Sequence, residues 1–319
     1  MMWYMFELAA ASLLVSLPNA LAKGIPPNTI QNLVTFGDSY TDIVNVFDGG
    51  APWPIYLADY ANLTLFAFAQ AGAVCDQNLT PRSAFPAVVQ NQIPEYFDAL
   101  AAGNITGDAN NTLFTQWIGT NDVGQLLTGA QTGEATVVDT MACAVEWVKT
   151  MYDGGARNFL FQNMVPLERT ILYSNDSYSN RYWTQERNTT EWSLFMRELT
   201  VSGNEIAKFM LKTLAPTLPD AHIGLLDSHG LFNDILNNPS SYLNGTAPLN
   251  TTGAVHSCIF QEFESTSDTG NCTIANGTDA DSFVWFDELH PSEQSDRIVA
   301  RQIANLIQGV HNDWTTWFS

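Results

Sequence analysis

Residues 33–42 read Leu-Val-Thr-Phe-Gly-Asp-Ser-Tyr-Thr-Asp. The first four are apolar or β-branched and predict a buried strand, which we expect to end at Gly37 because glycine adopts backbone angles that other residues avoid. Ser39 would then lie at the carboxyl end of the strand, the edge at which an open α/β sheet binds ligands. We expect its turn to open a helix, which would place the hydroxyl beside free backbone N–H groups. An acyl-transferring nucleophile requires this arrangement.

Asp38 and Ser39 also have a simpler explanation, because both residue types commonly cap helices. A second motif favours catalysis: Asp287 precedes His290 by three residues. On one turn, this spacing lets the carboxylate accept a hydrogen bond from imidazole Nδ1–H and leaves Nε2 facing outward. A structural histidine is the alternative, but no such carboxylate precedes the other four histidines, His222, His229, His256 and His311.

Four sequence blocks occur in the order of a known family. They are Gly37-Asp38-Ser39, Gly72, Gly119-Thr120-Asn121-Asp122 and Asp287-x-x-His290, and together they resemble the SGNH (GDSL-type) esterases and lipases. Within that family the chain is most similar to secreted fungal acetylesterases that act on carbohydrates (carbohydrate esterase family sixteen), by residues 36–42, 52–57 and 117–122. One position departs from the pattern: Ala67 stands where the family's second block often has asparagine.

The resemblance implies a role for each matching residue. Ser39 would be the nucleophile, His290 its base, and Asp287 the carboxylate that orients the imidazole. The oxyanion hole would consist of the Ser39 and Gly72 N–H groups and the Asn121 side-chain amide. Considered alone, Gly72 is a turn glycine and Asn121 is ordinary turn chemistry after a strand. This chemistry needs no metal and no cofactor.

The strand and helix pattern predicts an α/β fold with a central parallel sheet and helices on both faces. We expect strands at 33–36, 63–69, 113–118, 159–161 and 222–227, and helices at 134–152, 190–214 and 292–310. The family resemblance adds a three-layer α/β/α architecture with flavodoxin-like strand order. Residues 237–280 are polar and should form a long surface excursion. Trp53, on a loop rich in glycine and proline, either stacks on a sugar ring or plugs the core.

The composition bounds the possible partners. The chain has 319 residues with 12 Lys and Arg against 33 Asp and Glu, a net charge of −21 and a pI near 4.2. Such acidity argues against nucleic-acid partners and anionic membrane surfaces. No linker or repeat divides the chain, so we expect residues 23–319 to form one SGNH-type domain and to act as a monomer.

Residues 1–22 resemble a secretory signal peptide. An apolar core at 9–17 is broken by Pro18, and Ala-Leu-Ala at 20–22 is a small-x-small cleavage site. The usual basic residue near the start is missing. A transmembrane anchor is the alternative, but the apolar run is too short, since a span needs about 20 residues. We therefore expect a secreted, extracellular protein without a stable membrane anchor.

Cysteines and glycosylation sequons agree with secretion. The four cysteines fit two disulfides. Of the three possible pairings we favour Cys258–Cys272, a local clip, which leaves Cys75–Cys143. A zinc site is disfavoured because no two cysteines are two to four residues apart. Ten Asn-x-Ser/Thr sequons predict a glycosylated surface: Asn62, Asn78, Asn104, Asn110, Asn175, Asn188, Asn244, Asn250, Asn271 and Asn276.

These observations predict a secreted serine esterase. Its substrates would be short-chain esters, by resemblance O-acetyl groups on plant cell-wall carbohydrates. A lipase or phospholipase of the same family is one alternative and would need a broad apolar acyl groove. A catalytically weak carbohydrate-binding protein is the other, and it predicts the loss of a triad residue, whereas Ser39, Asp287 and His290 are all present.

Overall fold

The computed structural model describes residues 24–318, so the expected signal peptide lies outside the described residues. A six-stranded sheet forms the centre, in the order β10-β5-β4-β3-β1-β2. Its strands are β1 (Asn32–Gly37), β2 (Thr64–Ala67), β3 (Thr112–Trp117), β4 (Asn158–Gln162), β5 (His222–Leu226) and β10 (Thr315–Trp317). The first five are parallel, and β10 joins the edge of the sheet antiparallel to β5.

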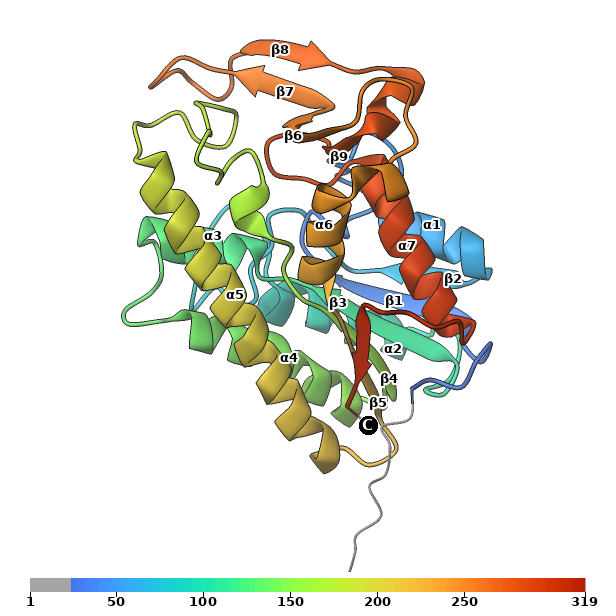
Figure 1. Ribbon diagram of the computed structural model, residues 1–319. Helices are drawn as coiled ribbons and strands as arrows, with labels where there is room; N and C mark the ends of the chain where they lie inside the picture. The colour runs from blue at the N-terminus through green and yellow to red at the C-terminus, as the bar shows by residue number, and fades with distance from the viewer. Residues whose placement is uncertain (1–23, 319) are drawn as a thin grey trace, which may run out of the picture.

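Helices cover both faces of the sheet (Figure 1). The α-helices are α1 (Trp53–Ala61), α2 (Ile93–Ala101), α3 (Thr120–Thr128), α4 (Val137–Asp153), α5 (Thr189–Leu214), α6 (Ser228–Asn237) and α7 (Glu293–Ile307). Helices α1 and α7 pack together on one face, and α4 packs against α5 on the other. Short helical turns lie at η1 (Val88–Gln92), η2 (Leu167–Arg169), η3 (Ala215–Thr217), η4 (Pro239–Ser241) and η5 (Gly277–Ser282).

The predicted α/β fold is confirmed, and the order β2-β1-β3-β4-β5 is the flavodoxin-like order that the family resemblance implied. Every residue of β1, β3 and β4 is buried. That burial explains why these strands read as continuous apolar and β-branched runs instead of alternating ones. Phe36 of β1 contacts Phe68, Tyr96 and Trp147, so aromatic rings fill the layer between sheet and helices.

The helix expected directly after Ser39 is absent, and that prediction was wrong. Residues 38–41 form a turn in which the N–H groups of Thr41 and Asp42 both donate to the Asp38 carbonyl at 3.0 Å. The first helix is α1, which begins at Trp53. Ser39 therefore sits on a tight strand-to-loop turn and does not cap a helix.

The polar excursion at 237–280 contains three of the four strands of two small sheets. Strand β6 (Asn250–Ala254) pairs with β9 (Phe283–Trp285), and β7 (His256–Ile259) forms an antiparallel pair with β8 (Asn271–Ile274). Cys258 lies opposite Cys272 in the second pair, and the two form a disulfide. Cys75 is bonded to Cys143. The favoured cysteine pairing is thus the one in the structure.

Each sequon asparagine is exposed except Asn250, which is half-buried. In residues 24–318, no helix is long and apolar enough to cross a bilayer.

Candidate active site

The turn that carries Ser39 depends on Gly37. Its φ of +147° is rare for other residues, and a Cβ there would lie 2.3 Å from the Trp117 carbonyl oxygen of the neighbouring strand. The Gln92 side chain holds both backbone groups of Gly37, because it accepts from Gly37 N–H at 3.0 Å and donates to the Gly37 carbonyl at 2.7 Å. The strand end is therefore held firmly beneath Ser39.

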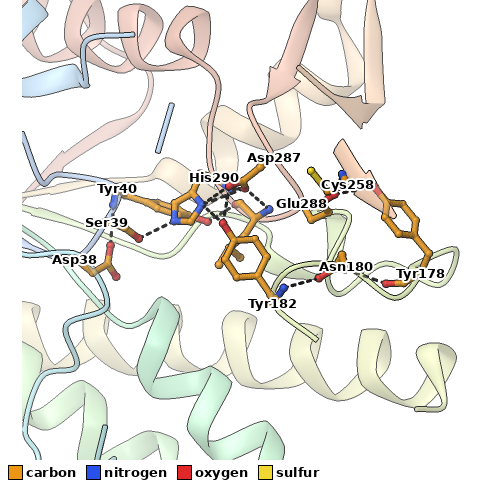
Figure 2. Close-up of polar contacts among 11 residues, drawn as sticks. Asp38, Ser39, Tyr40, Tyr178, Asn180, Tyr182, Cys258, Asp287, Glu288 and His290 are labelled. Carbon is orange, nitrogen blue, oxygen red and sulfur yellow. Dashed lines mark hydrogen bonds and ion pairs between the residues drawn. The ribbon is translucent and has the colours of Figure 1, made fainter. Parts of the chain in front are cut away.

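Ser39, His290 and Asp287 are joined by hydrogen bonds, although Ser39 and His290 are 251 positions apart in the sequence (Figure 2). Ser39 Oγ lies 2.8 Å from His290 Nε2. His290 Nδ1 lies 3.0 Å and 3.1 Å from the two Asp287 carboxylate oxygens. A neutral imidazole with its proton on Nδ1 donates to Asp287 and accepts the Ser39 proton, so the arrangement supports nucleophilic attack by Ser39.

Asp287 is completely buried yet remains a good acceptor. The N–H groups of Leu289 and His290 each donate to its Oδ1 at 2.8 Å, and the Tyr182 hydroxyl donates to Oδ2 at 2.5 Å. Burial alone would raise the pKa of Asp287, but the His290 imidazole and these hydrogen bonds hold it below its usual range. The carboxylate is therefore ionised and oriented toward the imidazole.

Tyr182 belongs to the site, although no motif or spacing in the sequence pointed to it. Its hydroxyl also lies 3.0 Å from His290 Nδ1. Asn180, which is fully buried, builds the turn that presents it, since Asn180 Oδ1 accepts from Tyr182 N–H at 3.0 Å (Figure 2). Tyr182 precedes Asp287 by 105 positions. No motif spacing connects two residues so far apart.

Two further aromatic rings frame the imidazole. The Phe47 ring stacks on His290 with centroids 5.0 Å apart and an interplanar angle of 20°. Tyr40 meets the imidazole edge-on at 5.6 Å, and its hydroxyl donates to the Leu289 carbonyl at 2.8 Å. These contacts limit how far His290 can move from Ser39.

The three expected oxyanion donors, Ser39, Gly72 and Asn121, line one cavity. Gly72 has a φ of +77°, and the preceding N–H, of Ala71, donates to Asp42 Oδ2 at 2.8 Å. Within residues 24–318, the Ser39 and Gly72 N–H groups have no hydrogen-bond acceptor. Asn121 Nδ2 donates to the Ala73 carbonyl at 2.9 Å, and this bond uses one of the two hydrogens on that nitrogen.

The cavity has a volume of about 390 Å³ and a largely aromatic wall. Its other polar lining residues are Arg82, Thr120, Gln125 and Thr128, and its aromatic ones are Phe47, Phe85, Tyr173, Tyr182, Trp183 and Trp192. Trp183 and Trp192 form a pair with ring centroids 4.8 Å apart. None of the six aromatic residues of this wall was predicted from the sequence.

Trp53 is not part of the cavity, and its assignment as a substrate contact was wrong. It is the first residue of α1 and is fully buried, with its indole N–H directed at Thr41 Oγ1 at 3.3 Å. The hydrophobic-plug alternative is the correct one. Position on a loop rich in glycine and proline did not reveal that the following helix packs the indole inward.

Two buried carboxyls support the strand ends. Burial raises the pKa of Asp38 to about 7 and that of Asp122 to about 6. Asp122 accepts from the Thr80 hydroxyl at 2.7 Å and from Cys75 N–H at 3.1 Å, so it ties the loop after Gly72 to the start of α3. It therefore holds the segments that carry Gly72 and Asn121 side by side.

The described residues contain one cluster with metal-ligand spacing, formed by His256, Cys258 and Cys272. Both sulfurs of this cluster are joined in a disulfide, which leaves only the imidazole to coordinate an ion. The cluster therefore does not have the donors of a metal site.

Residues 33–303 match the family model of the GDSL-like lipases and acylhydrolases. The chain is 28% identical to an acetylesterase from Hypocrea jecorina, over 92% of this chain and 93% of the relative. It is 23% identical to an acetylesterase from Thermothelomyces thermophilus, over 87% and 88%. A thermolabile hemolysin from Vibrio parahaemolyticus is 24% identical over 87% of this chain and 64% of the relative.

Solved structures of low sequence identity also match. An acetylxylan esterase from Geobacillus stearothermophilus is 12% identical, with a TM-score of 0.44, over 88% of this chain and 95% of the other. The family model, by contrast, spans most of the chain and includes all four motif blocks. The protein therefore belongs to the GDSL-like lipase/acylhydrolase family, as the SGNH resemblance implied, and it is a carboxylic ester hydrolase.

Proposed function

We propose that this esterase removes acetyl groups from carbohydrates through a Ser39–His290–Asp287 triad and an acyl-enzyme. The observation that carries the proposal is the 2.8 Å contact between Ser39 Oγ and His290 Nε2 at the wall of an aromatic cavity. The relatives named acetylesterase support acetyl as the acyl group.

The first half-reaction acylates Ser39. Its Oγ attacks the ester carbonyl carbon while its proton passes to His290 Nε2, and Asp287 stabilises the imidazolium. The negative charge on the carbonyl oxygen is received by the Ser39 and Gly72 N–H groups and the Asn121 amide, each donor being worth about 10²–10³ in rate. The tetrahedral intermediate then collapses, and the leaving alcohol takes the proton from His290.

The second half-reaction frees the enzyme. A water molecule gives one proton to His290 and attacks the acyl carbon bound to Ser39. Collapse of this second intermediate releases acetic acid, which ionises to acetate in solution, and returns the proton held by His290 to Ser39 Oγ. Every proton is moved by His290, so this sequence needs no cofactor.

Phe85 supports a short acyl group. A Cβ placed on Gly72 would lie 2.1 Å from the Phe85 ring, so the ring lies directly against an oxyanion donor and narrows the space beside it. Trp183 and Trp192 support a sugar as the alcohol part, because flat aromatic faces suit the C–H face of a pyranose ring. A lipase with longer acyl preference is the second candidate, favoured by the apolar lining of Leu172 and Leu289.

The protein is further proposed to be secreted, with residues 1–22 as the signal and 23–319 as one glycosylated, monomeric domain. Two disulfides suit an oxidising compartment. The exposure of nearly all the sequon asparagines leaves them accessible to a glycosyltransferase.

An acyl-length series tests the substrate proposal. Rates on p-nitrophenyl acetate, butyrate and octanoate should fall steeply with length, and acetylated xylo-oligosaccharides should be deacetylated. Phe85→Ala should raise the octanoate-to-acetate ratio about tenfold by opening the space beside Gly72. Phe209→Ala, which removes a 61%-exposed ring on α5, is the control and should leave the ratio unchanged. Equal wild-type rates on acetate and octanoate would establish the lipase alternative instead.

A further inference from the structure

We propose that Arg82 is a positioning residue that holds two of the three oxyanion donors in place. This inference rests on the proposed roles of Gly72 and Asn121. One nitrogen of the guanidinium, Nη1, donates to the Gly72 carbonyl at 2.8 Å and to Asn121 Oδ1 at 2.5 Å. Because Nη1 carries two hydrogens, it bridges both segments without giving up either bond. Gly72 and Asn121 come from different strand ends, so Arg82 fixes their separation.

The bond from Arg82 also sets the orientation of the Asn121 amide. Guanidinium groups only donate, so the Asn121 atom that faces Arg82 must be the oxygen. The nitrogen then faces the Ala73 carbonyl, to which it donates at 2.9 Å. Both contacts select the same rotamer and leave the second Nδ2 hydrogen free for a substrate oxygen. Without Arg82, only the Ala73 contact would oppose rotation of the amide.

Arg82 is itself held firmly. Its guanidinium carbon lies 4.2 Å above the centroid of the Phe85 ring. The backbone N–H of Arg82 donates to Gln77 Oε1 at 2.7 Å, and Nε2 of the same glutamine donates to the Phe85 carbonyl at 2.7 Å. The loop that carries Gln77, Arg82 and Phe85 is anchored at its beginning by the Cys75–Cys143 disulfide. Arg82 is therefore already in position before charge develops on the substrate. A group that need not move during the reaction stabilises the transition state most effectively.

The charge of Arg82 adds to its positioning role. The residue lines the cavity beside Gly72 and Asn121, where the carbonyl oxygen would become negative. The chain has 12 lysines and arginines in total, and in the described part of the chain Arg82 is the one of them that lines this cavity. A direct ion pair with an anionic substrate is the competing role, and it predicts a different kinetic signature.

The test is a double-mutant cycle on p-nitrophenyl acetate, a neutral substrate. Asn121→Ala should lower kcat about 10²–10³-fold. Arg82→Met keeps the stem over Phe85 but removes every donor, and it should lower kcat about 10–100-fold with KM within about twofold. Because part of the Arg82 effect passes through Asn121, the loss in the double variant should be smaller, by about threefold or more, than the product of the two single losses.

Arg157 offers a matched control. Its guanidinium also lies 4.2 Å above an aromatic ring, that of Tyr152, and its Nη1 also donates to two carbonyls, but it precedes β4 at the opposite end of the sheet from Ser39. Arg157→Met should retain wild-type kcat. If Arg82→Met lowers Tm by more than about 10 °C, Arg82→Lys decides the matter. A lysine keeps the charge and the stem but offers a single ammonium, and its kcat should fall between those of wild type and Arg82→Met.

Each outcome has a distinct meaning. Losses that multiply in the double variant, wild-type kcat in Arg82→Met or Arg82→Lys, or an effect confined to KM on anionic esters would overturn the inference about Arg82. Wild-type activity in Asn121→Ala would overturn the oxyanion role of Asn121 on which the inference rests, whereas full activity in Ser39→Ala would overturn the proposed function.

Discussion

The Tyr182 hydroxyl donates to Asp287 Oδ2 at 2.5 Å and lies 3.0 Å from His290 Nδ1. This hydrogen bond is one of the contacts that hold the pKa of Asp287 low against its burial. Tyr182→Phe removes it, so the pKa of Asp287 should rise and the carboxylate should be lost at a higher pH. We expect kcat on p-nitrophenyl acetate to fall about tenfold with little change in KM, because the carboxylate is held less firmly against the imidazole.

Tyr178 provides the control for that measurement. Its hydroxyl donates to Glu288 Oε1 at 3.1 Å, one position beyond Asp287 and on the same pair of segments. Tyr178→Phe makes the same chemical change without touching Asp287 or His290, and its kcat should match the wild type. A wild-type kcat in Tyr182→Phe would show that the tyrosine merely fills space.

Residue spacing explains which site residues could be predicted. Asp287 and His290 share one turn, and Ser39 follows a strand that can be predicted from the apolar residues of the strand itself. Local sequence therefore carries their signal. Tyr182 and Arg82 reach the site only through turns built by Asn180 and Gln77. Contacts of this kind depend on the folded backbone and leave no pattern in the sequence.

At the scale of elements, a carboxyl pair joins α7 to the loop that carries Phe47. Asp48 of the loop and Asp296 of α7 are both buried and hydrogen-bonded to each other. Burial raises the pKa of Asp48 to about 6, and burial together with the negative Asp48 raises that of Asp296 well above its usual range. Glu293, one turn earlier on α7, adds further negative charge. The pair is therefore held together by shared protons.

This pair should make the fold less stable as the pH rises. Both native pKa values lie above the ordinary value of 3.8, so above about pH 4 the folded chain keeps protons that the unfolded chain releases. Stability is then lost as the pH rises through about 6. Asp296→Asn donates a hydrogen bond at every pH, so its Tm should fall less than that of the wild type between pH 5 and 8.

The matched control is Asp59→Asn, an exposed aspartate on α1, the helix that packs on α7. It makes the same charge change away from the pair, and its Tm should fall as steeply as that of the wild type. Thermal melts at several pH values supply the data. Identical slopes in Asp296→Asn and the wild type would remove the pair from the explanation.

The elements differ in how well the sequence predicted them. Helix α5 and strands β1, β3, β4 and β5 came within one or two residues of their expected bounds, because each is a long amphipathic or apolar run. Strand β10 was missed, since Thr315–Trp317 has three residues and no apolar run of its own. It exists because the edge of β5 offers unpaired backbone groups. The prediction of a helix at Ser39 was wrong because the Asp38 side chain accepts from Tyr40 N–H and stabilises a turn instead.

At the scale of the whole molecule, the pattern of strands and helices predicted the parallel sheet but not the order of its strands. The order came from the family resemblance and is now visible as β2-β1-β3-β4-β5. The cavity could not be predicted, because its wall is assembled from separate segments that include Phe47, Phe85, Tyr173 and Trp183. These segments come together only when the sheet has folded and the carboxyl ends of its strands lie at one edge.

The central claim is that Ser39 is the nucleophile, and the most direct test is kcat of Ser39→Ala on p-nitrophenyl acetate beside its Tm. We expect kcat to fall by about 10⁴-fold or more, as for other triad nucleophiles. The Tm should stay near the wild-type value, because the backbone turn is held by Asp38 and Gln92 and not by the serine hydroxyl. Retention of more than about a tenth of the wild-type kcat would contradict the triad, and a large loss of Tm would assign the hydroxyl a structural role.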